Sequence, residues 1–127
     1  DVYKRQVTSH LMYGAEYDTR EKWVIESGTV TTKEIAEDST ELGNYYNNKN
    51  YPSRIVKTGE DGCINNIYGF AGNVDEWTQE WNSSSCRVIR GGCCNYGGNY
   101  CPVAFRIFFS PNDGYGCTGF RATLYIK

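Results

Sequence analysis

Cysteine is the residue type of this 127-residue chain that could most readily do chemistry, as a metal ligand, a nucleophile or half of a disulfide. Four of the six cysteines lie in one segment rich in aromatics and glycines, namely Cys93, Cys94, Cys101 and Cys117. A zinc site needs paired ligands such as CxxC with a second pair at suitable spacing, whereas the chain offers a vicinal Cys-Cys pair and one His. We therefore expect reduced thiols rather than a disulfide framework, and no structural metal site.

Acid, base and nucleophile pairs are equally sparse. His10 is the only histidine and lies far in sequence from the cysteine-rich segment, so no Ser/His or Cys/His pair is predicted. The neighbouring carboxylates are interpreted as a solvated face rather than as acid-base groups; they are Glu34, Glu37, Asp38 and Glu41. The sequence therefore predicts no catalytic residue.

The segment from Gly91 to Ile126 contains no Lys, Glu, Gln, Met or Trp, although all five occur from Asp1 to Arg90. Codons that end in a pyrimidine cannot encode these five residues. Randomising an Asn codon at its adenines, by contrast, can reach Cys, Tyr, Phe, Asn, Asp, Gly, Ser and Ile. The composition therefore predicts a variable region at 91–126 that forms a diversified recognition surface. The alternative is a glycine-rich loop region whose composition has drifted.

Length and composition fit a single domain, 1–127, with one modest core. The formal net charge is -2 and Lys and Arg do not cluster, which argues against a nucleic-acid partner. No apolar run approaches the roughly 20 residues that cross a bilayer, so we expect no membrane insertion. The chain begins at Asp1 without a Met, which is compatible with the C-terminal piece of a longer protein.

The first element predicted along the chain is a helix over 11–27, which the following glycine would end. Steps of three and four residues separate four positions that we expect to face the core: Met12, Ala15, Thr19 and Trp23. The stretch 29–52 is rich in Thr, Glu and Asn without a sustained period, and we interpret it as a long surface excursion.

Short strands are predicted in the second half. Arg54–Thr58 and Val74–Trp81 are strand candidates, and residues 59–62 form a turn between them. Over 120–126 apolar and polar residues alternate, which is typical of a half-buried strand. We expect its apolar residues to lie in the core; they are Phe120, Ala122, Leu124 and Ile126.

Three runs occur in a fixed order: NIYGFAGNVDEW at 66–77, RVIRGG at 87–92 and TGFRATL at 118–124. Together they resemble the formylglycine-generating enzyme family, also called sulfatase-modifying factors, which has a GNVWEW-like segment, RGGS and a terminal GFR. SHLMYGAEYD at 9–18 looks like the early helix of the same domain. The resemblance implies an α+β, C-type-lectin-like fold with a small antiparallel sheet, one or two helices and long irregular loops.

Structural duties are predicted for several residues of these runs. Trp77 is expected to point inward, and Glu76 to satisfy buried backbone or a cation. The planar guanidinium groups of Arg90, Arg106 and Arg121 suit them to tying loops together, so we interpret them as scaffold. Ligand contact is the alternative role for Arg90 or Arg121.

Members of the family are understood to hold copper between two cysteine thiolates. By position Cys101 matches the second of these, whereas Tyr96 occupies the first. Because a phenol cannot replace a soft thiolate, we expect no formylglycine-generating activity. A sulfatase-modifying oxidase, or a degenerate relative of one, remains the alternative.

The family also has a calcium site. Gly72, Val74 and Glu76 match positions that could offer two carbonyls and a carboxylate, but Gly69 replaces the Asn that would complete the set. We therefore expect no cofactor, with calcium near Glu76 as an alternative. The EPN and QPD triplets of sugar-binding lectins are absent, and Pro111–Asp113 is interpreted as a turn.

Within this fold family the sequence is most similar to the variable proteins of diversity-generating retroelements, found in phages and bacteria, whose C-terminal segment is rewritten at adenines. Residues that look fixed lie between the runs that look variable; they are 90–92, Pro102, Arg106, Pro111 and 119–121. The resemblance implies non-enzymatic ligand binding. We expect a protein or glycan ligand on a cell surface, and a location on a phage virion or bacterial surface.

Aromatic side chains of the variable region would supply contact area at low entropy cost, and Asn99 and Asp113 adaptable polar contacts. The complete set of predicted ligand contacts is Cys93, Cys94, Tyr96, Asn99, Tyr100, Phe105, Phe108, Phe109, Asp113, Tyr115 and Cys117. Strand alternation would send Phe105, Ile107 and Phe109 to one face and Arg106 and Phe108 to the other, so half of these aromatics could instead be core residues.

Overall fold

The computed structural model describes residues 7–83 and 85–126; the opening residues 1–6 lie outside this range. The elements are β1 (Val7–Leu11), α1 (Gly14–Glu26), α2 (Thr32–Ala36), the 3-10 helix η2 (Thr40–Leu42), β2 (Cys63–Ile64), β3 (Ile67–Tyr68), β4 (Asp75–Trp81), β5 (Arg87–Arg90), β6 (Ile107–Phe109), β7 (Thr118–Phe120) and β8 (Ala122–Ile126). The predicted α+β class, with small sheets, two helices and long irregular loops, is confirmed. None of the helices in the described part of the chain could span a membrane.

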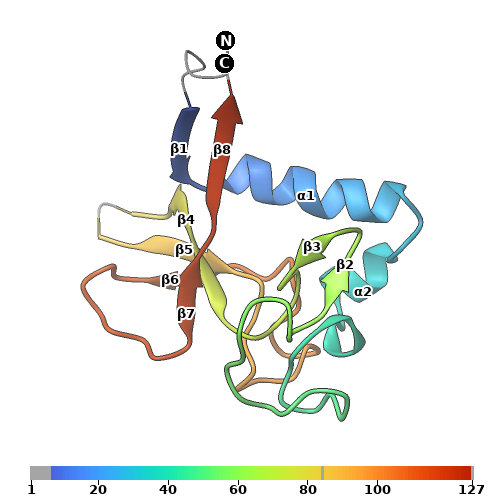
Figure 1. Ribbon diagram of the computed structural model, residues 1–127. Helices are drawn as coiled ribbons and strands as arrows, with labels where there is room; N and C mark the ends of the chain where they lie inside the picture. The colour runs from blue at the N-terminus through green and yellow to red at the C-terminus, as the bar shows by residue number, and fades with distance from the viewer. Residues whose placement is uncertain (1–6, 84, 127) are drawn as a thin grey trace.

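Three small sheets organise the chain. The largest has the strand order β6-β5-β4-β7, in which β7 runs parallel to β4 and the other pairs are antiparallel. β1 pairs with β8 antiparallel and brings the start of the described chain beside its end, while β2 and β3 form a separate short pair. In Figure 1, α1 runs away from the base of the β1–β8 ribbon above the looped half that contains α2, β2 and β3, and the four-stranded sheet lies to the left of that half. This arrangement agrees with the C-type-lectin-like fold that the resemblance implies.

The predicted helix is confirmed, but its predicted core face is wrong. The carboxylate of Glu16 accepts a hydrogen bond from the Tyr13 amide at 2.8 Å, and Gly28, with φ of +75°, follows the end of the helix. Ala15, Thr19 and Trp23 are exposed. The residues that α1 buries are Tyr17, Arg20, Glu21 and Val24.

Ion pairs explain why this polar face is the buried one. The side chain of Arg90 is fully buried, and its guanidinium lies 2.8 Å from Asp18, 3.2 Å from Glu21 and 3.4 Å from Glu80. Arg106, on the chain segment before β6, reaches the same Asp18 and Glu80 at 3.0 Å. The buried face of α1 therefore combines two core residues, Tyr17 and Val24, with carboxylates that pair with Arg90 across elements, a pairing that apolar spacing alone does not reveal.

The stretch 29–52 is not the predicted surface excursion. It contains α2 and η2 and buries several side chains, among them Ile35, Tyr45 and Asn48. The amide of Asn48 donates hydrogen bonds to the carbonyls of Thr40 and Gly43 at 2.8 and 3.0 Å. Buried amides that satisfy loop carbonyls leave no trace in a hydrophobicity pattern, which is why the burial was missed.

The strand predicted at Arg54–Thr58 is also wrong. The backbone amide of Val56 donates to Oδ1 of Asn73 at 2.9 Å, and its carbonyl accepts from Nδ2 of Asn73 at 3.1 Å. One side chain thus replaces the neighbouring strand that a ladder would need. By contrast, Val74–Trp81 forms β4 as predicted, although Trp77 is only half-buried.

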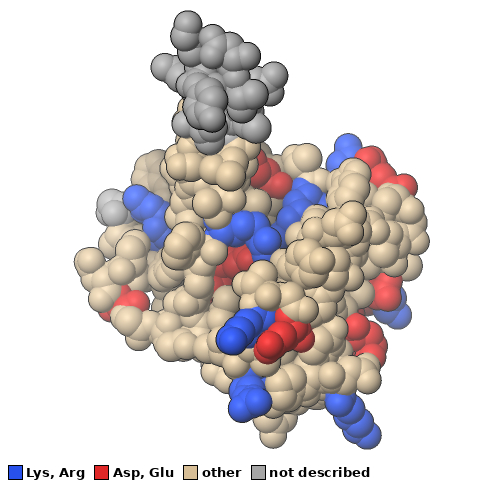
Figure 2. Space-filling model, in the orientation of Figure 1, with Lys and Arg blue, Asp and Glu red and all other residues tan. Residues whose placement is uncertain are grey.

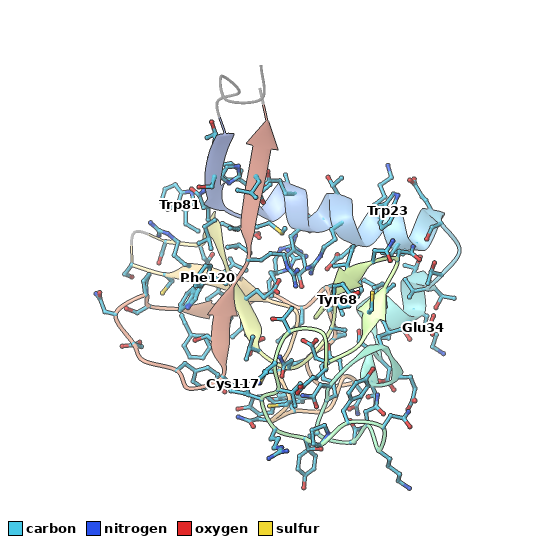
Figure 3. The ribbon with its side chains drawn as sticks, in the orientation of Figure 1. Trp23, Glu34, Tyr68, Trp81, Cys117 and Phe120 are labelled. Atoms are coloured by element: carbon cyan, nitrogen blue, oxygen red, sulfur yellow. The ribbon has the colours of Figure 1, made fainter. Side chains whose placement is uncertain are left out.

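The C-terminal alternation is real, but the buried face is the opposite of the predicted one. Phe120 and Leu124 are 75% and 66% exposed, and Ala122 is exposed as well. Arg121 instead turns inward to Glu76 at 2.7 Å, and the side chain of Ile126 lies outside the described residues. Glu76 on β4 pairs with Arg121 and holds the polar side of this segment inward, so the apolar side faces solvent. Figure 3 shows Phe120 at one end of β7 and Cys117 at the other.

Candidate functional site

The four cysteines of the segment 91–126, which is predicted to be variable, lie beneath the surface. Cys93, Cys94, Cys101 and Cys117 are all buried and carry no disulfide. The Sγ atoms of Cys94 and Cys117 are 3.9 Å apart. The expectation that Cys93, Cys94 and Cys117 contact ligand at the surface is therefore wrong, because the glycine turn after β5 leads the chain inward instead of outward.

Burial also suppresses the reactivity of these thiols. A hydrogen bond with Cys117 and burial raise the pKa of Cys93, and burial raises the pKa of Cys94. Burial raises the pKa of Cys101 to about 11. At neutral pH these side chains therefore remain thiols, which pack as small apolar groups.

The other predicted contacts are accessible, as expected. Tyr100 is 71% exposed, and Asn99 and Asp113 are exposed too. Exposed aromatics of the same segment are Tyr96, Phe105 and Phe108, whereas Phe109 and Tyr115 are half-buried. The chain therefore separates a surface layer of aromatic side chains from a buried layer of cysteines.

Most of these aromatics converge on one pocket of about 190 Å³, which we call the aromatic pocket. Its lining residues are Asp75, Tyr96, Tyr100, Cys101, Phe105, Ile107, Phe109 and Tyr115. The predicted alternation is confirmed, since Phe105, Ile107 and Phe109 line the pocket while Phe108 does not. β6 and the loops on either side of it build nearly all of the wall.

Contacts between the rings hold the wall together. The phenol oxygens of Tyr96 and Tyr115 are 3.1 Å apart, and this hydrogen bond raises the pKa of Tyr115. The ring of Tyr115 stacks on Phe109 at 5.2 Å, and the rings of Tyr96 and Tyr100 lie 5.8 Å apart. Contacts among its own rings therefore fix the positions of these side chains, which limits the side-chain entropy that would be lost on binding.

Asp75 is the pocket residue that the sequence analysis missed. It begins β4, outside the variable region, and is 1% exposed. Its Oδ1 atom has no hydrogen-bond partner, and burial raises the pKa of its carboxyl to about 6. A signal existed in the sequence: NVDEW carries an Asp where the GNVWEW-like segment of the resembled family has a Trp.

The residues related by resemblance to metal sites have other neighbours here. Tyr96 and Cys101, the two copper positions, both line the aromatic pocket. The carboxylate of Glu76 pairs with Arg121 at 2.7 Å and Arg20 at 3.4 Å, and Arg121 also donates to the Gly69 carbonyl at 3.0 Å. Within residues 7–83 and 85–126 no cluster of three or more His, Cys, Asp or Glu side chains could hold a metal.

The scaffold role predicted for the arginines is confirmed by these contacts. Arg90 and Arg106 tie α1 to the sheet, and Arg121 ties β4 to the loop around Gly69. On the face in Figure 2, basic and acidic side chains are interspersed, with wide uncharged stretches between them. The paired arginines therefore hold the elements of the domain together beside the aromatic pocket.

Fold and site together define a small α+β domain that presents an aromatic pocket built mostly from its C-terminal segment. No protein-family model matches the chain, and no curated protein matches it either. Among solved structures the chain is similar to Treponema denticola variable protein 1, with a TM-score of 0.65 and 26% sequence identity. The match covers 96% of this chain and 49% of that one, so the chain spans about half the length of its structural neighbour. The similarity supports a variable-protein-like chain, whereas formylglycine-generating enzymes are not identified by it.

Proposed function

We propose that this protein binds ligands through residues 91–126, a diversified surface carried on a C-type-lectin-like scaffold. One observation carries the proposal. Seven of the eight residues that line the aromatic pocket belong to the variable region, and the eighth is Asp75. The segment with the biased composition is therefore also the segment that builds most of the aromatic pocket.

The division between frame and display surface supports this function. Gly92, with φ of +73°, leaves no room for a side chain, because a Cβ atom would meet the Cys101 carbonyl and the ring of Tyr45. Arg90 next to it is buried and paired. Tyr96 and Tyr100, in the loop that follows, are exposed. Diversification of the exposed positions would thus change contacts with ligand and leave the supporting structure intact.

Aromatic residues suit a binding surface on energetic grounds. A Tyr or Phe side chain buries a large area on contact and loses only two side-chain torsions, which is why such residues dominate antibody paratopes. The ligand in this proposal is a protein or glycan on a cell surface, and the domain is displayed on a phage virion or a bacterial surface. This part of the proposal rests on the sequence resemblance.

The enzymatic alternative finds less support in the geometry of the site. A sulfatase-modifying oxidase would need two thiolates at the positions of Tyr96 and Cys101. The first of these positions holds a phenol that is hydrogen-bonded to Tyr115, and a phenol cannot replace a soft thiolate. The geometry therefore favours binding over oxidation.

A pair of libraries tests the proposal. The first randomises exposed positions with pyrimidine-ending codons at Tyr96, Asn99, Tyr100, Phe105, Phe108 and Asp113. The second uses the same codons at the buried Cys93, Cys94 and Cys117. We expect most members of the first library to stay folded and to yield binders to unrelated target proteins, and most members of the second to be lost. Selection of the first library back to the present residues, with no ligand in the experiment, would contradict the function.

A further inference from the structure

Asp75 places a carboxylate among aromatic side chains without a cation to neutralise it. No ion pair of the described residues includes Asp75, whereas its neighbour Glu76 pairs with both Arg20 and Arg121. Hydrogen bonds from the Cys93 thiol and the Gly92 amide to the carboxyl offset part of the burial penalty. A buried charge with an unpaired oxygen is unfavourable, and such a group calls for a partner from outside the protein.

The wall of the aromatic pocket favours a partner with positive charge. The faces of aromatic rings carry negative electrostatic potential and attract cations within about 6 Å. Tyr96, Tyr100, Phe105, Phe109 and Tyr115 all contribute to the wall. Rings and carboxylate therefore act in the same direction, and no Lys, Arg or His lines the pocket to oppose them.

We propose that the aromatic pocket binds a primary ammonium group on an alkyl chain, of the kind that a lysine side chain of a protein ligand presents. The N–H donors of the ammonium group would satisfy Oδ1 of Asp75, and the alkyl stem would pack against the rings and Ile107. The inference rests on the proposed function and deepens it by naming the ligand chemistry. A lysine fits better than an amino sugar, because the mostly apolar wall offers few partners for sugar hydroxyls.

The position of Asp75 has a consequence for diversification. The aromatic wall belongs to residues 91–126, but Asp75 belongs to β4 and lies outside the variable region. Rewriting of the variable region would therefore alter the shape of the pocket and leave the charge at its base unchanged. Different variants would share a preference for cationic groups while they differ in the surrounding contacts.

Two probes that share the same alkyl stem test the charge preference. Nα-acetyl-lysine N-methylamide and Nα-acetyl-norleucine N-methylamide differ by the terminal ammonium group. Each is titrated at about pH 8, where Asp75 is ionised, and the aromatic side-chain resonances are followed by NMR. We expect the lysine probe to shift the resonances of Phe109 and Tyr115, with the norleucine probe weaker by about tenfold or more.

Matched variants assign the effect to the pocket. Asp75→Asn keeps the size of the side chain and should weaken lysine binding by about tenfold or more. Tyr100→Ala should weaken it as well, while Tyr68→Ala, which removes an exposed tyrosine outside the pocket, should leave it unchanged. Thermal melting of each variant confirms that the comparison is made on folded protein.

Several results would overturn the inference. They are equal binding of both probes, unchanged lysine affinity in Asp75→Asn, no shift of the pocket resonances, or a glucosamine probe that binds more tightly than the lysine probe. None of these would remove the proposed function, because the library experiment selects binders without regard to charge. Loss of binders from the library together with a positive lysine titration would instead leave a cation site without a diversified surface.

Discussion

The frame around Arg90 and the variable region beside it distribute polar and apolar groups in opposite ways. The frame buries charge, since Arg90 lies between α1 and β4 with three carboxylates around it. The segment 91–126 buries thiols and turns most of its aromatic rings outward, with Tyr100 71% and Phe120 75% exposed. The difference shows that the contacts of each region decide which side chains it buries. The paired charges hold α1 and the sheet in one arrangement, whereas the exposed rings remain free to contact a ligand.

The two regions should therefore respond differently to substitution. A buried ion pair that loses one member leaves uncompensated charges, so the frame is intolerant. An exposed aromatic ring contributes little to folding, so the display surface is tolerant. The predictions below run from the largest expected effect on stability to the smallest.

Arg90→Ala should lower the free energy of unfolding by about 3 to 5 kcal/mol, because it leaves the buried carboxylate of Glu21 without its ion-pair partner, whereas Asp18 and Glu80 keep Arg106. Urea denaturation measures the loss. Arg106→Ala is the matched control. Its half-exposed ion pairs to Asp18 and Glu80 should contribute roughly 1 kcal/mol or less. Equal losses in the two variants would mean that burial does not distinguish frame from surface.

Cys117→Tyr should lower stability by about 1 to 3 kcal/mol, because the new ring must enter a closely packed cluster with Cys93 and Cys94. Cys63→Tyr makes the same exchange at an exposed cysteine and should change stability by roughly 0.5 kcal/mol or less. The melting temperatures of the two variants, compared with that of the parent, measure the two losses of stability. A Cys117→Tyr variant as stable as the parent would place this buried position within the freely variable surface.

Asp75→Asn should stabilise the protein at neutral pH by about 1 to 3 kcal/mol. The folded-state pKa of Asp75 is raised from 3.8 to about 6, so the native carboxyl keeps a proton that the unfolded chain has released. The contribution of Asp75 to stability is thus present below about pH 4 and is lost as the pH rises to about 6. Asn cannot ionise, so the advantage of the variant should grow through this window and then level off.

The free energy of unfolding of the parent and of Asp75→Asn, measured from pH 4 to pH 8, tests whether the advantage of the variant grows with pH. The other titratable groups around Asp75 are Glu76, Tyr45, Cys93, Cys94, Cys101 and Tyr115. Among those with a raised pKa, the thiols and phenols remain protonated throughout the window, so they should not obscure the change. An advantage that is constant with pH, or one that shrinks as the pH rises, would contradict the account.

Tyr100→Ala should change the free energy of unfolding by roughly 0.5 kcal/mol or less, as exposed positions do. Phe120→Ala should behave alike, because its ring is also exposed. Tyr45→Ala is the contrasting variant, since Tyr45 is buried and donates a hydrogen bond to the Gly91 carbonyl at 2.8 Å. If Tyr100→Ala melts as early as Tyr45→Ala, the ring belongs to the core and not to the display surface.

The sequence by itself determined the elements whose signals are local. The helix that ends before Gly28, strand β4 and the turn at Pro111–Asp113 were all predicted, and the structure confirms them. The alternation that directs Phe105, Ile107 and Phe109 to one face was predicted as well. Each of these signals depends on neighbours a few residues apart, which any conformation of the chain keeps together.

Only the tertiary structure decided which of two possible faces is buried and which residues meet. Periodicity identifies the residues that share a side of α1 or β8, but the buried side depends on partners far away, as in the hydrogen bond from Arg90 to Asp18 across 72 positions. For the same reason the sequence did not predict the thiol cluster, nor that Asp75 lies in one pocket with aromatic rings from another part of the chain. Long-range charge pairs and packing are absent from any local window, because they exist only once distant segments have come together.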